Sequence, residues 1–91
     1  MKLLLVEDEI PLADALSEIL KRNKYSVDAV YDGEDGLEYA KTGLYDCIVL
    51  DIMLPGMDGY ELCRRLRTKT SAPVLFLSAR DTELDKVVGL E

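Results

Sequence analysis

Two short apolar runs that each end on acidic residues constrain the fold of this chain most. Residues 3–6 are followed directly by Glu7 and Asp8, and residues 47–50 are followed by Asp51. A continuous apolar run of this length is typical of a strand buried on both faces of a parallel sheet. A charged side chain at the end of such a strand is costly unless something compensates it. The sequence therefore predicts two buried strands that lead into an acidic region.

The rest of the chain alternates between strand and helix patterns. We expect four strands, at residues 3–6, 25–30, 46–51 and 74–77. We expect four helices, beginning near Pro11, Asp32, Asp58 and Thr82. The strand at 25–30 alternates apolar and polar residues, which indicates a sheet edge. This order implies right-handed βαβ crossovers, a parallel sheet and helices on both faces.

The last predicted helix has no terminating signal. Thr82 and Asp85 form a capping box ahead of the apolar residues Val87 and Val88, and no glycine or proline stops the pattern before Glu91. We interpret residues 1–91 as one domain that is an N-terminal fragment, cut within this helix.

Composition excludes several classes of function. The 91 residues are 48% hydrophobic and 32% charged, with a net charge of −7, which is typical of a small globular domain and a poor match to nucleic acid or an anionic membrane. The local basic cluster of Arg64, Arg65 and Arg67 suits the end of a helix. No direct nucleic acid or membrane partner is expected.

The two cysteines, Cys47 and Cys63, have no metal-binding or redox spacing, and we interpret them as reduced, intracellular thiols. The opening MKLLLVEDE is too short for a signal peptide core or a membrane span. We therefore expect a cytoplasmic location.

The acidic residues fall where parallel sheets bind ligands. Glu7, Asp8, Asp51 and Ser78 all follow predicted strands, and ligands of open parallel sheets lie at the carboxyl ends of the strands. Carboxylates that converge there repel one another, and Mg²⁺ relieves the repulsion, whereas Zn²⁺ favours the histidine and cysteine ligands that are missing. The chemistry that suits this group is phosphoryl transfer onto Asp51.

Each of these residues also has a structural interpretation. Glu7 and Asp8 could be acids at a helix start, Asp51 a cap, and Ser78 a turn residue. Their joint occurrence at strand ends favours the site.

Three segments, LLLVEDE, CIVLDIMLPGMDGYEL and PVLFLSARD, resemble the receiver domain of bacterial response regulators, particularly those attached to winged-helix transcription factors. The resemblance implies a flavodoxin-like (CheY-like) α/β fold with a doubly wound parallel sheet, here truncated to about four βα units with strand order 2-1-3-4. It implies that Asp51 is the phosphoacceptor, that Glu7, Asp8, Asp51 and the backbone carbonyl of Met53 hold Mg²⁺, and that Ser78 is the switch hydroxyl.

The resemblance also implies a sensor histidine kinase as partner, and a signalling module instead of an enzyme. Ala79 matches the small residue beside the switch hydroxyl. This sequence lacks the family's fifth strand and fifth helix, and with them the lysine that ion-pairs with the phosphoryl group and the aromatic switch residue. Neither Lys69 nor Lys86 is expected to replace that lysine.

The expected truncation leaves part of one sheet face bare and makes the fourth strand an open edge. An uncovered helix footprint on the order of 400 Å² corresponds to roughly 10 kcal/mol of lost burial, comparable to the whole stability of a domain. We therefore expect a homodimer or a complementing chain.

Three alternatives were weighed. The first is a non-signalling flavodoxin-like fragment that only assembles. The second is a phosphatase of the haloacid dehalogenase type, which needs an aspartate where this chain has Met53. The third is a flavin mononucleotide site, where the acids at residues 7–9 would repel the phosphate.

Overall fold

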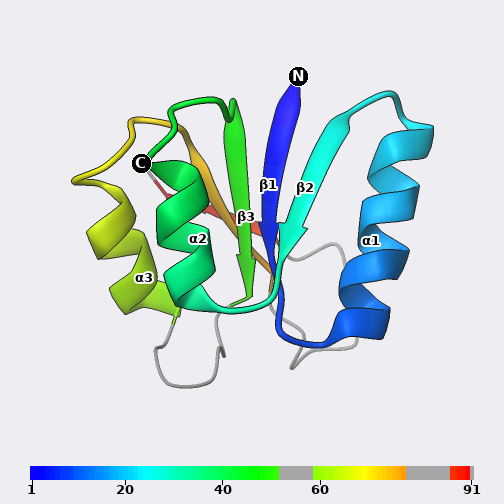
Figure 1. Ribbon diagram of the computed structural model, residues 1–91, viewed down its shortest axis with the longest axis horizontal. Helices are drawn as coiled ribbons and strands as arrows, with labels where there is room; N and C mark the ends of the chain where they lie inside the picture. Colours follow the sequence, from blue (N-terminus) through cyan, green and yellow to red (C-terminus); the bar gives the residue numbers. More distant parts are fainter. Residues whose placement is uncertain (52–58, 78–86, 91) are drawn as a thin grey trace.

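The computed structural model describes residues 1–51 and 59–77 and the backbone of 87–90. One five-stranded sheet in the order β2-β1-β3-β4-β5 forms the centre of the molecule (Figure 1). Its strands are β1 (Lys2–Val6), β2 (Ser26–Val30), β3 (Cys47–Asp51), β4 (Val74–Leu77) and β5 (Val87–Leu90). Its helices are α1 (Ile10–Arg22), α2 (Gly33–Ala40) and α3 (Gly59–Leu66).

Strands β1 to β4 are parallel, and their order, 2-1-3-4, is the predicted one. β2 lies at one edge of the sheet, as its alternating pattern predicted. The chain leaves β1 in one direction to form β2 and returns on the other side to form β3. The topological switch point of the sheet therefore lies between the carboxyl ends of β1 and β3.

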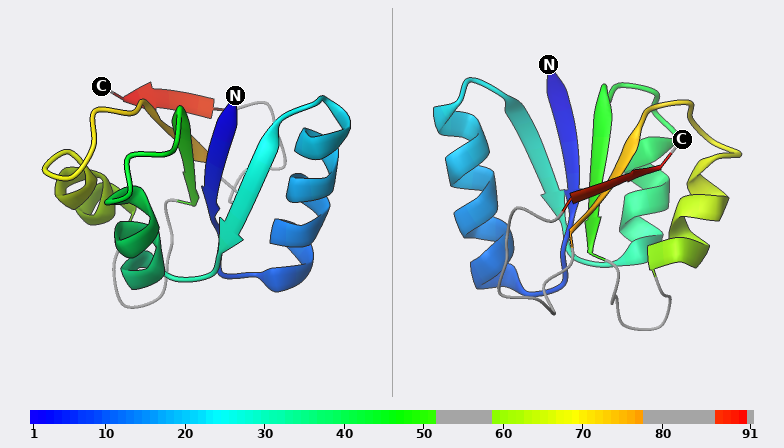
Figure 2. Two further views of the ribbon diagram at one scale, coloured as in Figure 1. Left: turned by 45° about the horizontal axis from the view of Figure 1, so that its top comes forward. Right: turned by 180° about the vertical axis from the view of Figure 1, so that it is seen from behind.

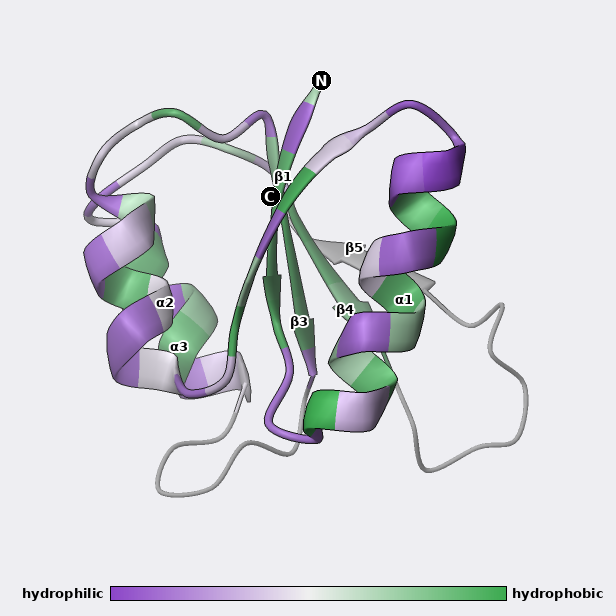
Figure 3. Cartoon of the chain, turned by 45° about the vertical axis from the view of Figure 1, so that its right-hand side comes forward, coloured by the Kyte–Doolittle hydropathy of each residue, from purple (hydrophilic) through white to green (hydrophobic). Residues whose placement is uncertain are grey.

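Helices cover the two faces of the sheet unequally. α1 lies on one face, and α2 and α3 lie on the other (Figures 1 and 3). Successive residues of β1 divide between two cores, because side chains alternate along a strand. Leu3 and Leu5 pack in the core on the α1 side, and Leu4 and Val6 pack in the core on the other side.

α1 and α2 begin where the sequence predicts them. Pro11 occupies the first turn of α1, where its missing N–H costs nothing, and Lys21 and Arg22 lie in the last turn. Asp32 caps α2 by accepting a hydrogen bond of 2.8 Å from the backbone N–H of Asp35. The predicted cap of α3, Asp58, lies outside the described residues.

The prediction of a fourth helix over the end of the chain is wrong. Residues 87–90 form strand β5, which pairs antiparallel with β4, with Val87 opposite Leu77 and Leu90 opposite Val74 (Figure 2). The outer edge of β4 offers a row of backbone N–H and C=O groups, and the β-branched Val87 and Val88 favour a strand. The prediction that β4 is an open edge is wrong for the same reason.

A polar network closes the amino-terminal end of the sheet. The Tyr45 hydroxyl donates a hydrogen bond of 2.6 Å to Asp28, and the Lys2 ammonium lies 3.5 Å from the same carboxylate. The backbone N–H of Lys2 donates to the Asp46 carboxylate at 2.8 Å. These contacts fix β1 against β2 and β3 at the end of the sheet opposite the acidic residues. Within the described helices, none is long and apolar enough to cross a membrane.

Candidate functional site

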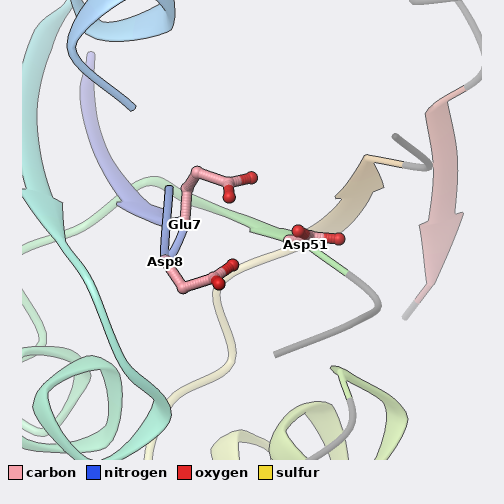
Figure 4. Close-up of side chains that lie close together, drawn as sticks. All are labelled: Glu7, Asp8 and Asp51. Carbon is pink, nitrogen blue, oxygen red and sulfur yellow. The ribbon is translucent and has the colours of Figure 1, made fainter. Parts of the chain in front are cut away.

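Three acidic residues meet at the carboxyl ends of the two central strands. Asp51 is the last residue of β3, and Glu7 and Asp8 directly follow β1. β1 and β3 are hydrogen-bonded neighbours, with Val6 opposite Leu50. Glu7 follows Val6 and Asp51 follows Leu50, so these two residues lie side by side. Figure 4 shows the side chains of Glu7, Asp8 and Asp51 gathered around one space.

The three carboxylates are close and largely withdrawn from solvent. One oxygen from each residue lies within 4.8 Å of the other two. Glu7 is 1% exposed and Asp51 is 6% exposed, whereas Asp8 is half-buried. Such burial is unusual for acidic residues and costs free energy unless a cation or hydrogen bonds offset it.

The pKa of Glu7 reflects this cost of burying a charge. The pKa of Glu7 is raised from 4.5 to about 7, mainly by burial and also by the neighbouring carboxylates of Asp51 and Asp8, while a hydrogen bond from the backbone N–H of Glu9 opposes the shift. That bond measures 3.0 Å, and the Glu7 N–H itself donates to the Val30 carbonyl at 3.1 Å. Backbone contacts therefore hold Glu7 in place despite its unfavourable charge.

This group of donors fits a hard divalent cation. All three donors are carboxylates, which suit Mg²⁺, and the described part of the chain brings no cysteine or histidine to the cluster. Oxygens that share one Mg²⁺ lie at most about 4.2 Å apart, given metal–oxygen distances near 2.1 Å. The three carboxylate oxygens lie within 4.8 Å of one another, so small side-chain adjustments or a water molecule would let them share one ion.

The cluster contains three of the five residues that the sequence singled out. The roles of Glu7, Asp8 and Asp51 stay predictions, but the three do lie together. Ser78 and Met53 lie outside the described residues, as does Ala79. Sequence reasoning missed Glu9, whose backbone N–H donates a hydrogen bond to the Glu7 carboxylate. A turn at the start of α1, signalled by Pro11, is the only sequence feature that points to it.

A four-stranded parallel arrangement in the order 2-1-3-4, with acidic residues at the switch point, defines a CheY-like flavodoxin fold. The model of the response regulator receiver domain family matches residues 3–91, and the chain belongs to this family. It is the receiver domain of a response regulator, a component of two-component signalling.

Solved structures agree with this assignment. The receiver domain of the hybrid histidine kinase CckA is 33% identical, with a TM-score of 0.82, over 90% of this chain and 79% of that one. A receiver domain of a Francisella response regulator is 32% identical, with a TM-score of 0.80, over 90% and 69%. The response regulator TrrA from Thermotoga maritima, solved in complex with Mg²⁺-BeF, is 34% identical, with a TM-score of 0.81, over 86% and 69%.

Proposed function

We propose that this receiver accepts a phosphoryl group on the Asp51 carboxylate from a sensor histidine kinase, in a reaction that depends on Mg²⁺. The convergence of Glu7, Asp8 and Asp51 at the switch point carries this proposal. Glu7, Asp8 and Asp51 would hold the ion, together with the backbone carbonyl of Met53, and Ser78 would be the switch hydroxyl. The solved structure of TrrA with Mg²⁺-BeF supports the choice of metal.

In the proposed reaction, a carboxylate oxygen of Asp51 attacks the phosphorus atom of the donor. The new bond is an acyl phosphate linkage, and the bond between phosphorus and the donor's nitrogen or oxygen breaks, so that the donor leaves with the electron pair. Mg²⁺, when bound, offsets the negative charge of the phosphoryl oxygens. The burial of Asp51 limits the access of water to the product.

The experiment is a measurement of intact mass after incubation with Mg²⁺ and a small-molecule phosphodonor. We expect one phosphoryl adduct on the unchanged chain and none on Asp51→Asn or after removal of Mg²⁺ with a chelator. Asp46→Asn is the matched control, because Asp46 precedes the same strand at the opposite end of the sheet. An adduct on Asp51→Asn, or none on the folded unchanged chain, would contradict the proposal.

The finer assignments belong to the same proposal. The resemblance favours a receiver of the winged-helix transcription factor type that is not itself an enzyme and works in the cytoplasm. A second copy of the chain or a complementing chain is the further partner that belongs to this proposal.

A further inference from the structure

The main chain at Glu9 connects helix α1 to the acidic cluster of Glu7, Asp8 and Asp51. The N–H of Glu9 donates a hydrogen bond of 3.0 Å to Oε2 of Glu7. The carbonyl of Glu9 accepts a bond of 2.8 Å from the N–H of Ala13, which is the first hydrogen bond of α1. One residue therefore begins the helix with its carbonyl and holds a side chain of the proposed metal site with its N–H.

The surrounding structure keeps the N–H of Glu9 in place. Ala13 is fully buried in the core on the α1 side of the sheet, so the start of the helix is anchored by packing. Pro11 in the first turn restricts the backbone further. On the other side, the N–H of Glu7 donates to the carbonyl of Val30 at 3.1 Å. The short segment that carries Glu7 and Glu9 is therefore fixed to α1 at one end and to β2 at the other.

The hydrogen bond from Glu9 orients the Glu7 carboxylate before any ion binds. A free glutamate side chain adopts many conformations and loses that freedom when it becomes a metal ligand. Glu7 is buried, so water cannot easily replace the N–H as a donor, and a bond from an N–H to a carboxylate is stronger there than at the surface. Contacts that orient a metal ligand in this way raise the affinity for the metal.

A bond of the same chemistry at the start of α2 provides a comparison. The carboxylate of Asp32 accepts a hydrogen bond of 2.8 Å from the N–H of Asp35. Asp32 does not belong to the acidic cluster, whereas Glu7 does. The two bonds therefore hold carboxylates at the starts of two helices, and the bond from Glu9 is the one of the pair that reaches the proposed metal site.

We propose that the main-chain N–H of Glu9 is a positioning group of the metal site, and that it couples the binding of a divalent cation at the acidic cluster to the order of the first turn of α1. Glu9 is not a metal ligand in this proposal and acts through the carboxylate of Glu7. The coupling is reciprocal: if the hydrogen bond favours binding of the ion, the bound ion favours the hydrogen bond. This inference rests on the proposed binding of Mg²⁺ and adds the group that orients a ligand.

The test compares Glu9→Pro with Glu9→Gln. Proline removes the N–H, and the φ angle of Glu9, −81°, is close to the value of about −65° that proline requires. Glutamine keeps the N–H and removes only the charge of an exposed side chain. Asp35→Pro is the matched control for the proline, because it removes an exposed acid in the first turn of α2 together with the N–H that bonds Asp32.

Amide NMR spectra of the 91-residue chain, recorded during a titration with magnesium chloride, measure the dissociation constant of the ion. We expect Glu9→Pro to weaken binding by about tenfold or more, because it removes a contact that orients a ligand. We expect Glu9→Gln and Asp35→Pro to weaken it by less than about threefold, because each removes only a charge outside the cluster.

Hydrogen exchange of the Ala13 N–H is the second readout, and a purely structural role of Glu9 would not make it depend on the metal. Saturating Mg²⁺ should slow this exchange by about threefold or more in the unchanged chain and in Glu9→Gln. In Glu9→Pro, Mg²⁺ should leave the exchange rate unchanged, because the link between the Glu7 carboxylate and the helix is absent.

Equal dissociation constants for Glu9→Pro and Asp35→Pro would overturn this inference and leave the proposed phosphoryl transfer intact. Equal slowing of the Ala13 exchange by Mg²⁺ in the unchanged chain and in Glu9→Pro would do the same. If the unchanged chain bound no Mg²⁺, both proposals would fail. If Glu9→Pro does not fold, replacement of Glu9 by its α-hydroxy acid analogue removes the same N–H by turning the peptide bond into an ester, and we expect the same weakening of about tenfold or more.

Discussion

The carboxylates of Glu7 and Asp51 share one buried space, although the two residues lie far apart in the sequence. The pairing of Val6 with Leu50 in adjacent parallel strands produces this proximity. In the absence of a cation, each carboxylate raises the cost of ionising the other. In the metal-free domain, this repulsion between the two carboxylates therefore costs free energy, and several measurements can detect the cost.

The first prediction concerns stability and pH. The folded chain holds a proton on Glu7 up to a pKa of about 7, whereas the unfolded chain releases it near 4.5. Because the folded state binds more protons between these values, the free energy of unfolding should fall as pH rises through this window, by at most about 3 kcal/mol. Urea denaturation in the presence of a chelator, from about pH 5 to 8, measures the fall.

Glu7→Gln should remove this fall, because the amide stays neutral at every pH. Glu9→Gln is the matched control, since Glu9 is exposed and contributes to the site through its backbone N–H. Parallel curves for the unchanged chain and Glu7→Gln would contradict the prediction.

The second prediction concerns the causes of the Glu7 shift. Asp51→Asn removes one neighbouring negative charge, so the pKa of Glu7 should fall below about 7. It should stay above 4.5, because burial is the largest cause of the shift and the substitution leaves burial intact. Carboxyl carbon chemical shifts measured by NMR against pH, with Asp46→Asn as control, give both values. A pKa that returns fully to 4.5 would mean that charge repulsion dominates.

The third prediction concerns the hydrogen bond between Tyr45 and Asp28. Tyr45→Phe removes the donor of a 2.6 Å bond and should lower the free energy of unfolding by about 1 kcal/mol. The same bond is the main reason that the pKa of Asp28 lies below its usual value, so this pKa should rise in the variant. Because a lowered carboxyl pKa stabilises the fold above the unfolded pKa, the loss should shrink as the solution becomes acidic.

Tyr31→Phe is the control for that comparison. Tyr31 is 39% exposed, and in the described residues its hydroxyl has no hydrogen bond of the kind that Tyr45 makes. Equal losses in the two variants at neutral pH would show that the bond to Asp28 contributes no stability.

The fourth prediction concerns the packing of α2 on β1. A Cβ atom at Gly36 would lie 3.1 Å from Cγ2 of Val6, which is fully buried next to the acidic site. Alanine favours a helix over glycine by about 1 kcal/mol, but overpacking a closed core costs about 1–3 kcal/mol. Gly36→Ala should therefore lower the melting temperature slightly, despite its better helix propensity.

A double-mutant cycle with Val6→Ala isolates the clash. Shortening Val6 makes room for the added methyl group, so Gly36→Ala should be less harmful, or stabilising, in the Val6→Ala background. Additive effects would show that the contact is not responsible.

Local sequence was sufficient where one segment determines its own structure. The apolar runs at 3–6 and 47–50 form buried strands because no other arrangement hides so many consecutive apolar residues, and acidic residues follow because the chain leaves the core there. Asp32 caps α2 because its side chain reaches only three residues ahead. The strand order 2-1-3-4 was expected only from the resemblance to receiver domains, because the right hand of βαβ units limits which face a crossover helix covers and leaves the order of the strands open.

Only the tertiary structure decided the features that depend on distant partners. Residues 87–90 carry a pattern that suits a helix or a strand, and the free edge of β4 selects the strand. The raised pKa of Glu7 depends on burial by the whole sheet and on Asp51, which no local pattern measures. The position of α1 over β2 and β1 is also a tertiary feature, because a helix's lateral position on a sheet results from packing among many side chains at once.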